Sequence, residues 1–210
     1  MPTIWTFGDS LTEGYSEKYD WSKSYIEWKK YKPKVYCEFL SEKLNFDLQN
    51  LGKGGSDNYT IFQTFCNISH KIKDNDLIIF GWSSPVRFRL STPNDNWNTY
   101  IPNFDKNYPN IKTISVDTIK ETLINRESFL FCDEVNSWIK LINNFLKNMK
   151  VVHWTYFDHR LKAFYVRNLE TISKETNKEV DDPHFSENGH FELSEILFNL
   201  YKQKNQNKLI

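Results

Sequence analysis

Two short groups of residues contain the side chains whose chemistry is most easily recognised. Gly8-Asp9-Ser10-Leu11 places a serine hydroxyl directly after a strand-like run. Near the C-terminus, Asp181 and His184 stand three residues apart, with Pro183 between them. A serine nucleophile needs a base, and the base needs an acceptor on its other ring nitrogen. These residues therefore allow a Ser-His-Asp arrangement, although each group alone is also typical of a turn or a helix start.

A third group, Asn50-Leu51-Gly52-Lys53-Gly54-Gly55, lies between a predicted strand and a predicted helix. Adjacent glycines there can direct bare backbone N–H groups at an anion or at a developing oxyanion. A phosphate-binding loop is the competing interpretation. Neither GxGxxG nor GxxxxGK[ST] occurs in the chain, which disfavours nucleotide binding.

Glycine is scarce, with only seven residues in 210. A chain this poor in glycine is expected to keep each one for a backbone requirement that other residues do not meet. Four of them fall in the groups above, Gly14 lies just after the first group, Gly81 ends another strand-like run, and Gly189 closely follows His184. Their positions mark four separated segments of candidate site.

The elements that must position these segments alternate between apolar runs and helical periodicities, which favours an α/β fold. Predicted strands cover residues 4–7, 46–51, 77–82 and 151–154, and helical patterns cover 35–44, 135–149 and 193–200, the last capped by Ser186. The run 77–82 is apolar throughout, as expected of a parallel strand covered on both faces. Ligands bind at the carboxyl edge of such a sheet, where the glycine segments would lie.

Two aromatic-rich stretches, at about 13–34 and 91–112, match no predicted element. Because aromatic content argues against disorder, we interpret both as ordered insertions in a single domain that spans 1–210. Lys plus Arg and Asp plus Glu both number 27, so no basic excess indicates a nucleic-acid partner. No apolar run approaches the roughly 20 residues of a membrane helix.

Three cysteines, Cys37, Cys66 and Cys132, are widely spaced and show no metal-ligand spacing. This excludes a disulfide scaffold and a zinc finger, and no metal site is expected. No signal peptide is visible after Met1. The expectation is a cytoplasmic protein.

Taken together, the segments resemble the SGNH (GDSL) hydrolase superfamily. Gly8-Asp9-Ser10-Leu11 matches its first block, Asn50 to Gly55 matches the second, and Asp181-x-x-His184 matches the last. The resemblance implies a three-layer α/β/α sandwich with a parallel, flavodoxin-like sheet. It also implies ester hydrolysis without a cofactor, with Ser10, His184 and Asp181 as the catalytic triad and the N–H groups of Ser10 and Gly55 in the oxyanion hole.

The third block departs from the family pattern. The family has Gly-x-Asn-Asp, with the Asn amide as an oxyanion donor, whereas this chain has Gly81-Trp82-Ser83-Ser84. Ser83 is expected to donate at the Asn position, directly or through water, unless Asn58 or Arg87 replaces it. A hydroxyl reaches less far than a carboxamide, and losing one oxyanion donor typically costs about 3 kcal/mol of transition-state stabilisation.

Residues beside these blocks are candidates for contacts with the substrate. The candidates are Asp9, Asn58, Trp82 and Arg87. Asp9 is expected to brace the nucleophile loop by hydrogen bonds. The overall hypothesis is an esterase for small-molecule esters, with small acyl groups or acylated carbohydrates as substrates. An acyltransferase with the same triad is an alternative, and a catalytically silent binding module is another, supported by Ser83.

Overall fold

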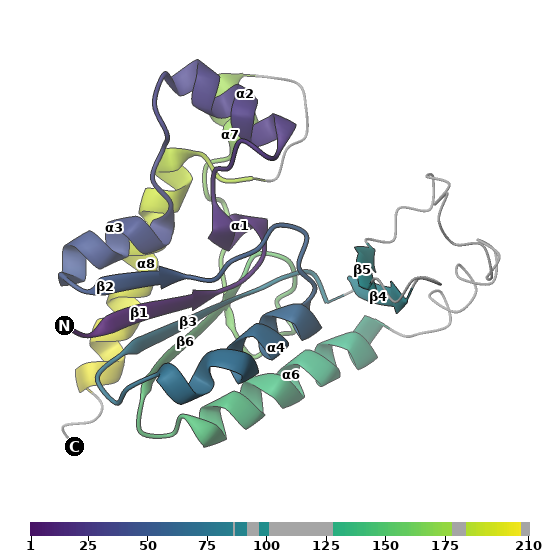
Figure 1. Cartoon of the computed structure of the whole chain (residues 1–210), viewed down its shortest axis with the longest axis vertical. Helices are drawn as coiled ribbons and strands as arrows, with labels where there is room; N and C mark the ends of the chain where they lie inside the picture. The colour runs from purple at the N-terminus through teal and green to yellow at the C-terminus, as the bar shows by residue number, and fades with distance from the viewer. Residues whose placement is uncertain (86, 92–96, 101–127, 178–183, 207–210) are drawn as a thin grey trace.

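A five-stranded parallel sheet forms the centre of the molecule, in the order β2-β1-β3-β6-β7 (Figure 1). The computed structural model describes residues 1–85, 87–91, 97–100, 128–177 and 184–206. The strands are β1 (Thr3–Phe7), β2 (Asp47–Asn50), β3 (Leu77–Trp82), β6 (Lys150–Thr155) and β7 (Phe164–Tyr165). All four neighbouring pairs are parallel, as in the flavodoxin-like order. The predicted strands are confirmed to within two residues at either end.

The sheet is buried because β3, its middle strand, presents apolar side chains to both faces. Leu77 and Ile79 lie in one core cluster, whereas Ile78 and Phe80 lie in the other. This alternation follows from the two-residue period of a strand, and it explains why the run contains no polar residue.

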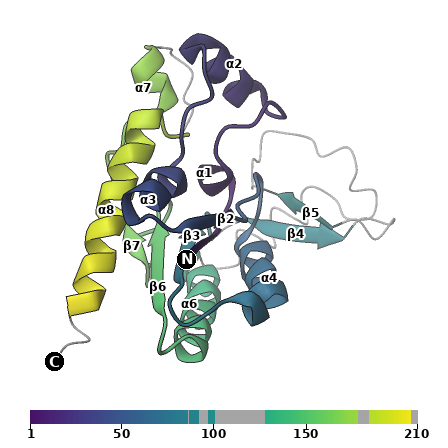
Figure 2. The same ribbon diagram turned by 60° about the vertical axis from the view of Figure 1, so that its left-hand side comes forward.

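Helices cover both faces of the sheet and complete a three-layer α/β/α sandwich. α3 (Tyr36–Leu44) and α8 (Glu187–Gln206) pack on one face, and α4 (Asn58–Ile68) and α6 (Ser128–Phe145) pack on the other (Figures 1 and 2). The expected fold class is thus confirmed. Ser186 caps α8, because its hydroxyl accepts a hydrogen bond from Gly189 N at 3.1 Å.

The remaining helices and strands lie outside the five-stranded sheet and the four helices that cover it. They are α1 (Ser10–Glu13), α2 (Asp20–Lys29), η1 (Ser69–Lys71), β4 (Phe88–Ser91), β5 (Trp97–Tyr100) and α7 (Ile172–Thr176). β4 and β5 form a separate antiparallel pair. Among the described residues, no helix combines the length and the apolar character needed to cross a membrane.

The insertion at 13–34 differs from its prediction because it contains the ten-residue helix α2. The helical period of hydrophobic residues is not visible in the sequence, because aromatic residues occur at both buried and exposed positions. Tyr25 is buried, while Trp28 on the next turn is 47% exposed. α2 lies beside α7 in both ribbon views (Figures 1 and 2), where Lys29 Nζ and Glu175 Oε1 are 2.6 Å apart. The second insertion, 91–112, includes β5, and its other residues lie outside the described part apart from Ser91.

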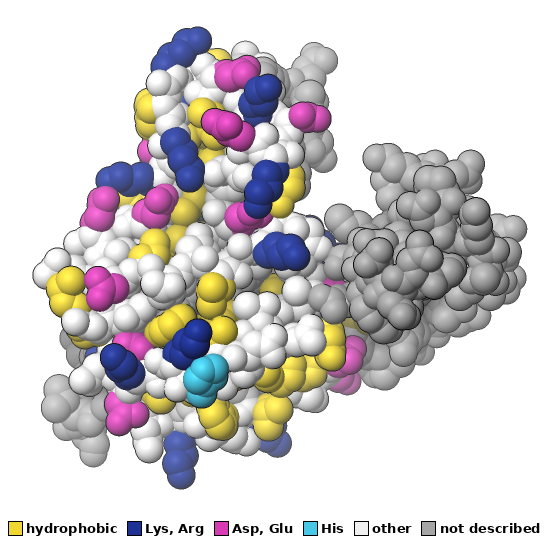
Figure 3. Space-filling model, viewed as in Figure 1, with side chains coloured by type: hydrophobic (Ala, Val, Ile, Leu, Met, Phe, Trp, Pro, Cys, Tyr) yellow, Lys and Arg dark blue, Asp and Glu magenta, His cyan; other side chains and the backbone are white. Residues whose placement is uncertain are grey.

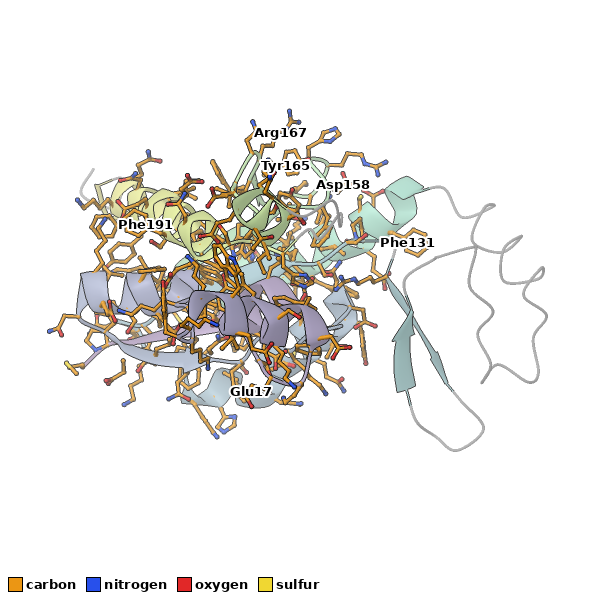
Figure 4. All side chains as sticks on the ribbon, turned by 90° about the horizontal axis from the view of Figure 1, so that it is seen from above. Glu17, Phe131, Asp158, Tyr165, Arg167 and Phe191 are labelled. Atoms are coloured by element: carbon orange, nitrogen blue, oxygen red, sulfur yellow. The ribbon has the colours of Figure 1, made fainter. Side chains whose placement is uncertain are left out.

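Two further features concern the turn after β6 and the outer surface of α4 and α6. On the turn after β6, Asp158 lies close to the start of α6 (Figure 4). Its carboxylate pairs with Arg160. Hydrogen bonds from Arg160 lower the pKa of Asp158 to about 2. On the opposite side of the sheet from α8, Phe62, Leu141 and Phe145 line an apolar hollow of about 210 Å³ between α4 and α6. Hydrophobic side chains are visible on the surface over these two helices (Figure 3).

Candidate active site

The nucleophile candidate stands on a tight turn between β1 and α1. Ser10 is the first residue of α1, and the Asp9 carboxylate caps that helix by accepting from Leu11 N at 3.0 Å. The Asp9 carbonyl also accepts from Thr12 N and Glu13 N. These bonds fix the turn at the carboxyl end of β1 and leave the Ser10 side chain partly exposed.

A histidine from the other end of the chain reaches this serine. His184 Nε2 lies 3.0 Å from Ser10 Oγ, which is hydrogen-bonding distance. The backbone of the segment that contains His184 is anchored at two consecutive carbonyls: Ile172 N donates to the His184 carbonyl at 2.9 Å, and the Tyr15 hydroxyl donates to the Phe185 carbonyl at 2.9 Å. Asp181, the third member of the predicted triad, lies outside the described residues.

The glycine segment after β2 is held against the nucleophile turn. The Asn50 amide donates to the Thr12 carbonyl at 2.8 Å, and Lys53 N donates to the Gly8 carbonyl at 3.0 Å. Glu13 Oε2 accepts from Gly54 N at 2.6 Å. The segment is therefore fixed beside Ser10 by bonds that leave Gly55 out.

Gly55 itself has the geometry of a residue beside an open space. Its φ of +77° is a conformation that favours glycine, and a Cβ built on it would meet no atom within 4 Å. Open space beside a glycine is what a substrate oxygen would need in order to approach a backbone N–H of this loop.

A buried polar network lies under the nucleophile turn, where β3 ends. Asp9 Oδ2 accepts from Ser83 Oγ at 2.8 Å and from Arg87 Nη1 at 2.9 Å. The same Arg87 nitrogen donates to the Ser56 carbonyl at 3.1 Å. Arg87 thereby connects the residue before Ser10 to the residue after Gly55.

A sequence comparison identifies the family of this chain. Residues 4–197 match the GDSL-like lipase/acylhydrolase family. The chain belongs to that family. A search of curated proteins found no match to this chain.

Several solved structures are similar to this member of the family at low sequence identity. One is a member of the lipolytic G-D-S-L family from Veillonella parvula, with 12% identity, coverage of 98% of this chain and 75% of that chain, and a TM-score of 0.36. Another is a variant of an acetyl-xylooligosaccharide esterase from Geobacillus, with 13% identity, coverage of 95% and 94%, and a TM-score of 0.46. The family match makes this GDSL-like protein a hydrolase of the SGNH type, for which small-molecule esters are the implied substrates.

The environment of Ser83 in this GDSL-like hydrolase differs from the expectation. Ser83 is completely buried, and its hydroxyl proton goes to Asp9, so that proton is not directed at an oxyanion. Asn58 is also engaged, because its amide nitrogen donates to the Ser83 carbonyl at 3.0 Å and its oxygen accepts from Ser83 N at 2.8 Å. Both residues shape the end of β3 beneath the nucleophile.

The structure does not bring the Trp82 side chain to the site. The indole is 1% exposed and lies in the core cluster on the α4 and α6 face, where Nε1 donates to His153 Nδ1 at 3.2 Å. The physical reason is the strand period: Trp82 and Ser83 are neighbours, so their side chains leave the sheet edge in different directions. The predicted contact between the Trp82 side chain and the substrate is therefore wrong.

One residue at the site was missed by the sequence reasoning. The Trp21 indole stacks on the His184 imidazole, with ring centroids 3.6 Å apart and planes inclined by 11°. Trp21 lies in the first turn of α2, far from His184 in the sequence. The abundance of aromatic residues in 13–34 was the only signal, and it did not distinguish Trp21 from its neighbours.

Burial controls the protonation of the groups behind the site. It lowers the pKa of His190 to about 3, and the charge of His184 adds to this effect. Burial also raises the pKa of Tyr15 well above its ordinary value. Both side chains are therefore neutral near pH 7. In the described part of the chain, no group of three or more His, Cys, Asp or Glu side chains is arranged to hold a metal ion.

Proposed function

We propose that this hydrolase cleaves carboxylic esters with small or carbohydrate-linked acyl groups through a Ser10-His184-Asp181 triad. The observation that carries the proposal is the 3.0 Å contact between Ser10 Oγ and His184 Nε2. This contact joins two distant segments at the carboxyl edge of the sheet, beside the Gly55 loop. A nucleophile within hydrogen-bond reach of a base, next to bare backbone N–H groups, is the arrangement needed for acyl transfer.

In the acylation step, Ser10 Oγ forms a bond to the ester carbonyl carbon while its proton passes to His184 Nε2. The carbonyl oxygen becomes an oxyanion, which accepts hydrogen bonds from the backbone N–H groups of Ser10 and Gly55. The tetrahedral intermediate then breaks its bond to the alcohol oxygen. That oxygen takes the proton from His184 and leaves as the alcohol, so an acyl-Ser10 ester remains.

Deacylation repeats the sequence with water as the nucleophile. Water attacks the acyl carbon and gives a proton to His184, a second oxyanion forms in the same hole, and Ser10 leaves after recovering the proton. The products are the carboxylic acid and the free enzyme. Asp181 is assigned to the Nδ1 side of His184, where a carboxylate keeps the required tautomer and stabilises the imidazolium.

The test combines a fluorophosphonate, which labels activated serines, with hydrolysis of p-nitrophenyl acetate, butyrate and octanoate. Wild-type protein should be labelled and should hydrolyse the short esters best, and Ser10→Ala should abolish both signals. Activity should rise between about pH 5 and 8 as one group loses a proton. Absence of Ser10-dependent labelling would instead favour a silent binding module.

Asp181→Asn tests the acid, with Asp182→Asn as the matched control at the next residue. Replacing the triad carboxylate by an amide lowers kcat about 10⁴-fold in a serine protease, and a similar loss is expected for Asp181→Asn. Asp182→Asn should change kcat only slightly. Equal losses in the two variants would contradict the assignment of Asp181. Product analysis with an added alcohol would separate hydrolysis from acyl transfer, because an acyltransferase would form the new ester.

A further inference from the structure

The contact between Trp21 and His184 has a consequence for which esters the site accepts. The two rings are nearly parallel at 3.6 Å, so the indole covers one face of the imidazole. The imidazole edge that carries Nε2 remains directed at Ser10 Oγ. The indole therefore leaves proton transfer open and occupies the space directly above the base.

The indole is fixed in this place by the elements around it. The Tyr19 ring lies parallel to Trp21, with centroids 6.0 Å apart, and its hydroxyl donates to Glu13 Oε2 at 2.9 Å. Further along α2, the Tyr25 hydroxyl accepts from Glu187 N at 3.0 Å. Trp21 is thus part of a rigid aromatic surface that extends from His184 to Glu13.

The alcohol part of an ester must pass next to this surface. During acylation the leaving oxygen has to lie within about 2.6–3.2 Å of His184 Nε2 to take the proton. The acyl carbon is then bonded to Ser10 Oγ, and its oxygen faces the Gly55 loop. The group beyond the leaving oxygen is therefore the part of the substrate closest to the ring that covers His184.

We propose that Trp21 forms the wall of the subsite for the alcohol, and that it favours alcohols carrying a flat six-membered ring. An indole face makes favourable contacts with another ring by stacking or through ring C–H groups. Trp21 is thus a specificity-determining residue on the alcohol side of the scissile bond. This inference rests on the proposed function, because it requires Ser10 to be the nucleophile and His184 the proton donor.

The experiment compares two esters that share an acyl group, benzyl acetate and ethyl acetate, in wild type, Trp21→Ala and Trp21→Phe. Both form the same acetyl-enzyme, so the ratio of their kcat/KM values isolates the alcohol. A stacked ring contributes about 0.5–1.5 kcal/mol, so the ratio should fall about 2- to 12-fold in Trp21→Ala. Trp21→Phe should keep a ratio close to that of wild type. Cyclohexylmethyl acetate, tested in parallel, separates aromatic stacking from contact with a saturated ring such as that of a sugar.

Two controls limit the interpretation. Trp28→Ala removes an exposed indole from the same helix and should leave the ratio unchanged. The acyl-side ratio, ethyl phenylacetate over ethyl acetate, should be the same in Trp21→Ala and wild type. Thermal unfolding would show whether each variant is folded, and Trp21→Leu, which keeps an apolar side chain but removes the ring, takes the place of Trp21→Ala if that variant does not fold.

Three results would overturn the proposal. Equal losses on benzyl and ethyl acetate would mean that Trp21 only positions His184. A change in the acyl-side ratio would put the indole on the other side of the bond. An equal effect of Trp28→Ala would assign the change to α2 as a whole. If no ester is hydrolysed in a Ser10-dependent way, the proposed function fails as well, whereas normal hydrolysis with an unchanged alcohol ratio refutes the Trp21 assignment alone.

Discussion

Replacing Arg87 by methionine tests whether one buried ion pair holds together the two loops that carry the proposed oxyanion donors, Ser10 and Gly55. Arg87 Nη1 donates both to Asp9, which precedes the nucleophile, and to Ser56, which follows Gly55. The Arg87 and Asp9 side chains are only 10% and 3% exposed. Methionine keeps the unbranched stem of the side chain and removes the guanidinium with its charge and its donors.

The expected loss of stability follows from the bonds that Asp9 would keep. Removing one partner of a buried ion pair costs about 3–5 kcal/mol, because the other charge is left uncompensated. Asp9 would still accept from Leu11 N and Ser83 Oγ, so the free energy of unfolding should fall by about 3 kcal/mol, at the lower end of that range.

The effect on catalysis follows from the loops that Arg87 connects. Complete loss of an oxyanion donor lowers kcat about 10²- to 10³-fold. In Arg87→Met the Ser10 and Gly55 N–H groups remain, but the hydrogen bonds that join their two loops through Arg87 are lost. We therefore expect kcat for p-nitrophenyl acetate to fall about 10- to 100-fold, less than if a donor were deleted.

Urea unfolding and steady-state kinetics measure the two effects separately. Arg160→Met is the matched control, because Arg160 also pairs with an aspartate but is 43% exposed on its side chain. It should lose far less stability and no activity. The reasoning is refuted if Arg87→Met loses no more stability than Arg160→Met. The role of Arg87 in holding the two loops together is refuted separately if Arg87→Met is destabilised as expected but keeps its full kcat.

Three further predictions concern other described residues. Burial lowers the pKa values of His153 and His190 to about 3, so below about pH 6.5 the unfolded chain binds more protons than the folded protein. Each histidine should therefore lower the free energy of unfolding by about 1 kcal/mol for every unit by which the pH falls in this range. Urea unfolding between pH 7 and 5 should show a weaker dependence of stability on pH in His153→Gln than in wild type, and an unchanged dependence would contradict this. Ser83→Ala should destabilise the fold by about 1–2 kcal/mol while lowering kcat less than tenfold, since the hydroxyl serves Asp9; a loss of 10² or more would make Ser83 an oxyanion donor after all. Gly189→Ala should lower stability by about 1–3 kcal/mol in thermal unfolding, because its Cβ would lie 2.1 Å from the Glu170 carbonyl oxygen, and a neutral result would show that this backbone contact relaxes freely.

The arrangement of the sheet and the gathering of the Ser10, Gly55 and Ser83 segments at one edge could be predicted from sequence for one physical reason. Parallel strands end at the same edge, so residues directly after β1, β2 and β3 have to lie near one another. Scarce glycines at those strand ends marked the segments in advance. The position of His184 is different, because no strand period determines it, and it rested on the resemblance to a known family.

Two parts of the site could not be predicted, because they depend on contacts between side chains. Trp21 belongs to a helix whose inward face is aromatic, and composition alone does not say which ring reaches His184. The direction of the Ser83 hydroxyl depends on Asp9, whose carboxylate is already committed to Leu11 N and Arg87. Tertiary packing decides both.

The departure at Ser83 is best understood together with Arg87. A carboxylate buried next to the nucleophile needs donors for both of its oxygens. Here Leu11 N satisfies Oδ1, and Ser83 Oγ and Arg87 Nη1 satisfy Oδ2, so the short hydroxyl and the long guanidinium share one acceptor. Arg87 then reaches on to Ser56, a contact that directly links the nucleophile turn to the loop after Gly55. The serine at this position is therefore one member of a buried network that holds together the two loops carrying the proposed oxyanion donors, so the change from asparagine to serine is compatible with the proposed hole.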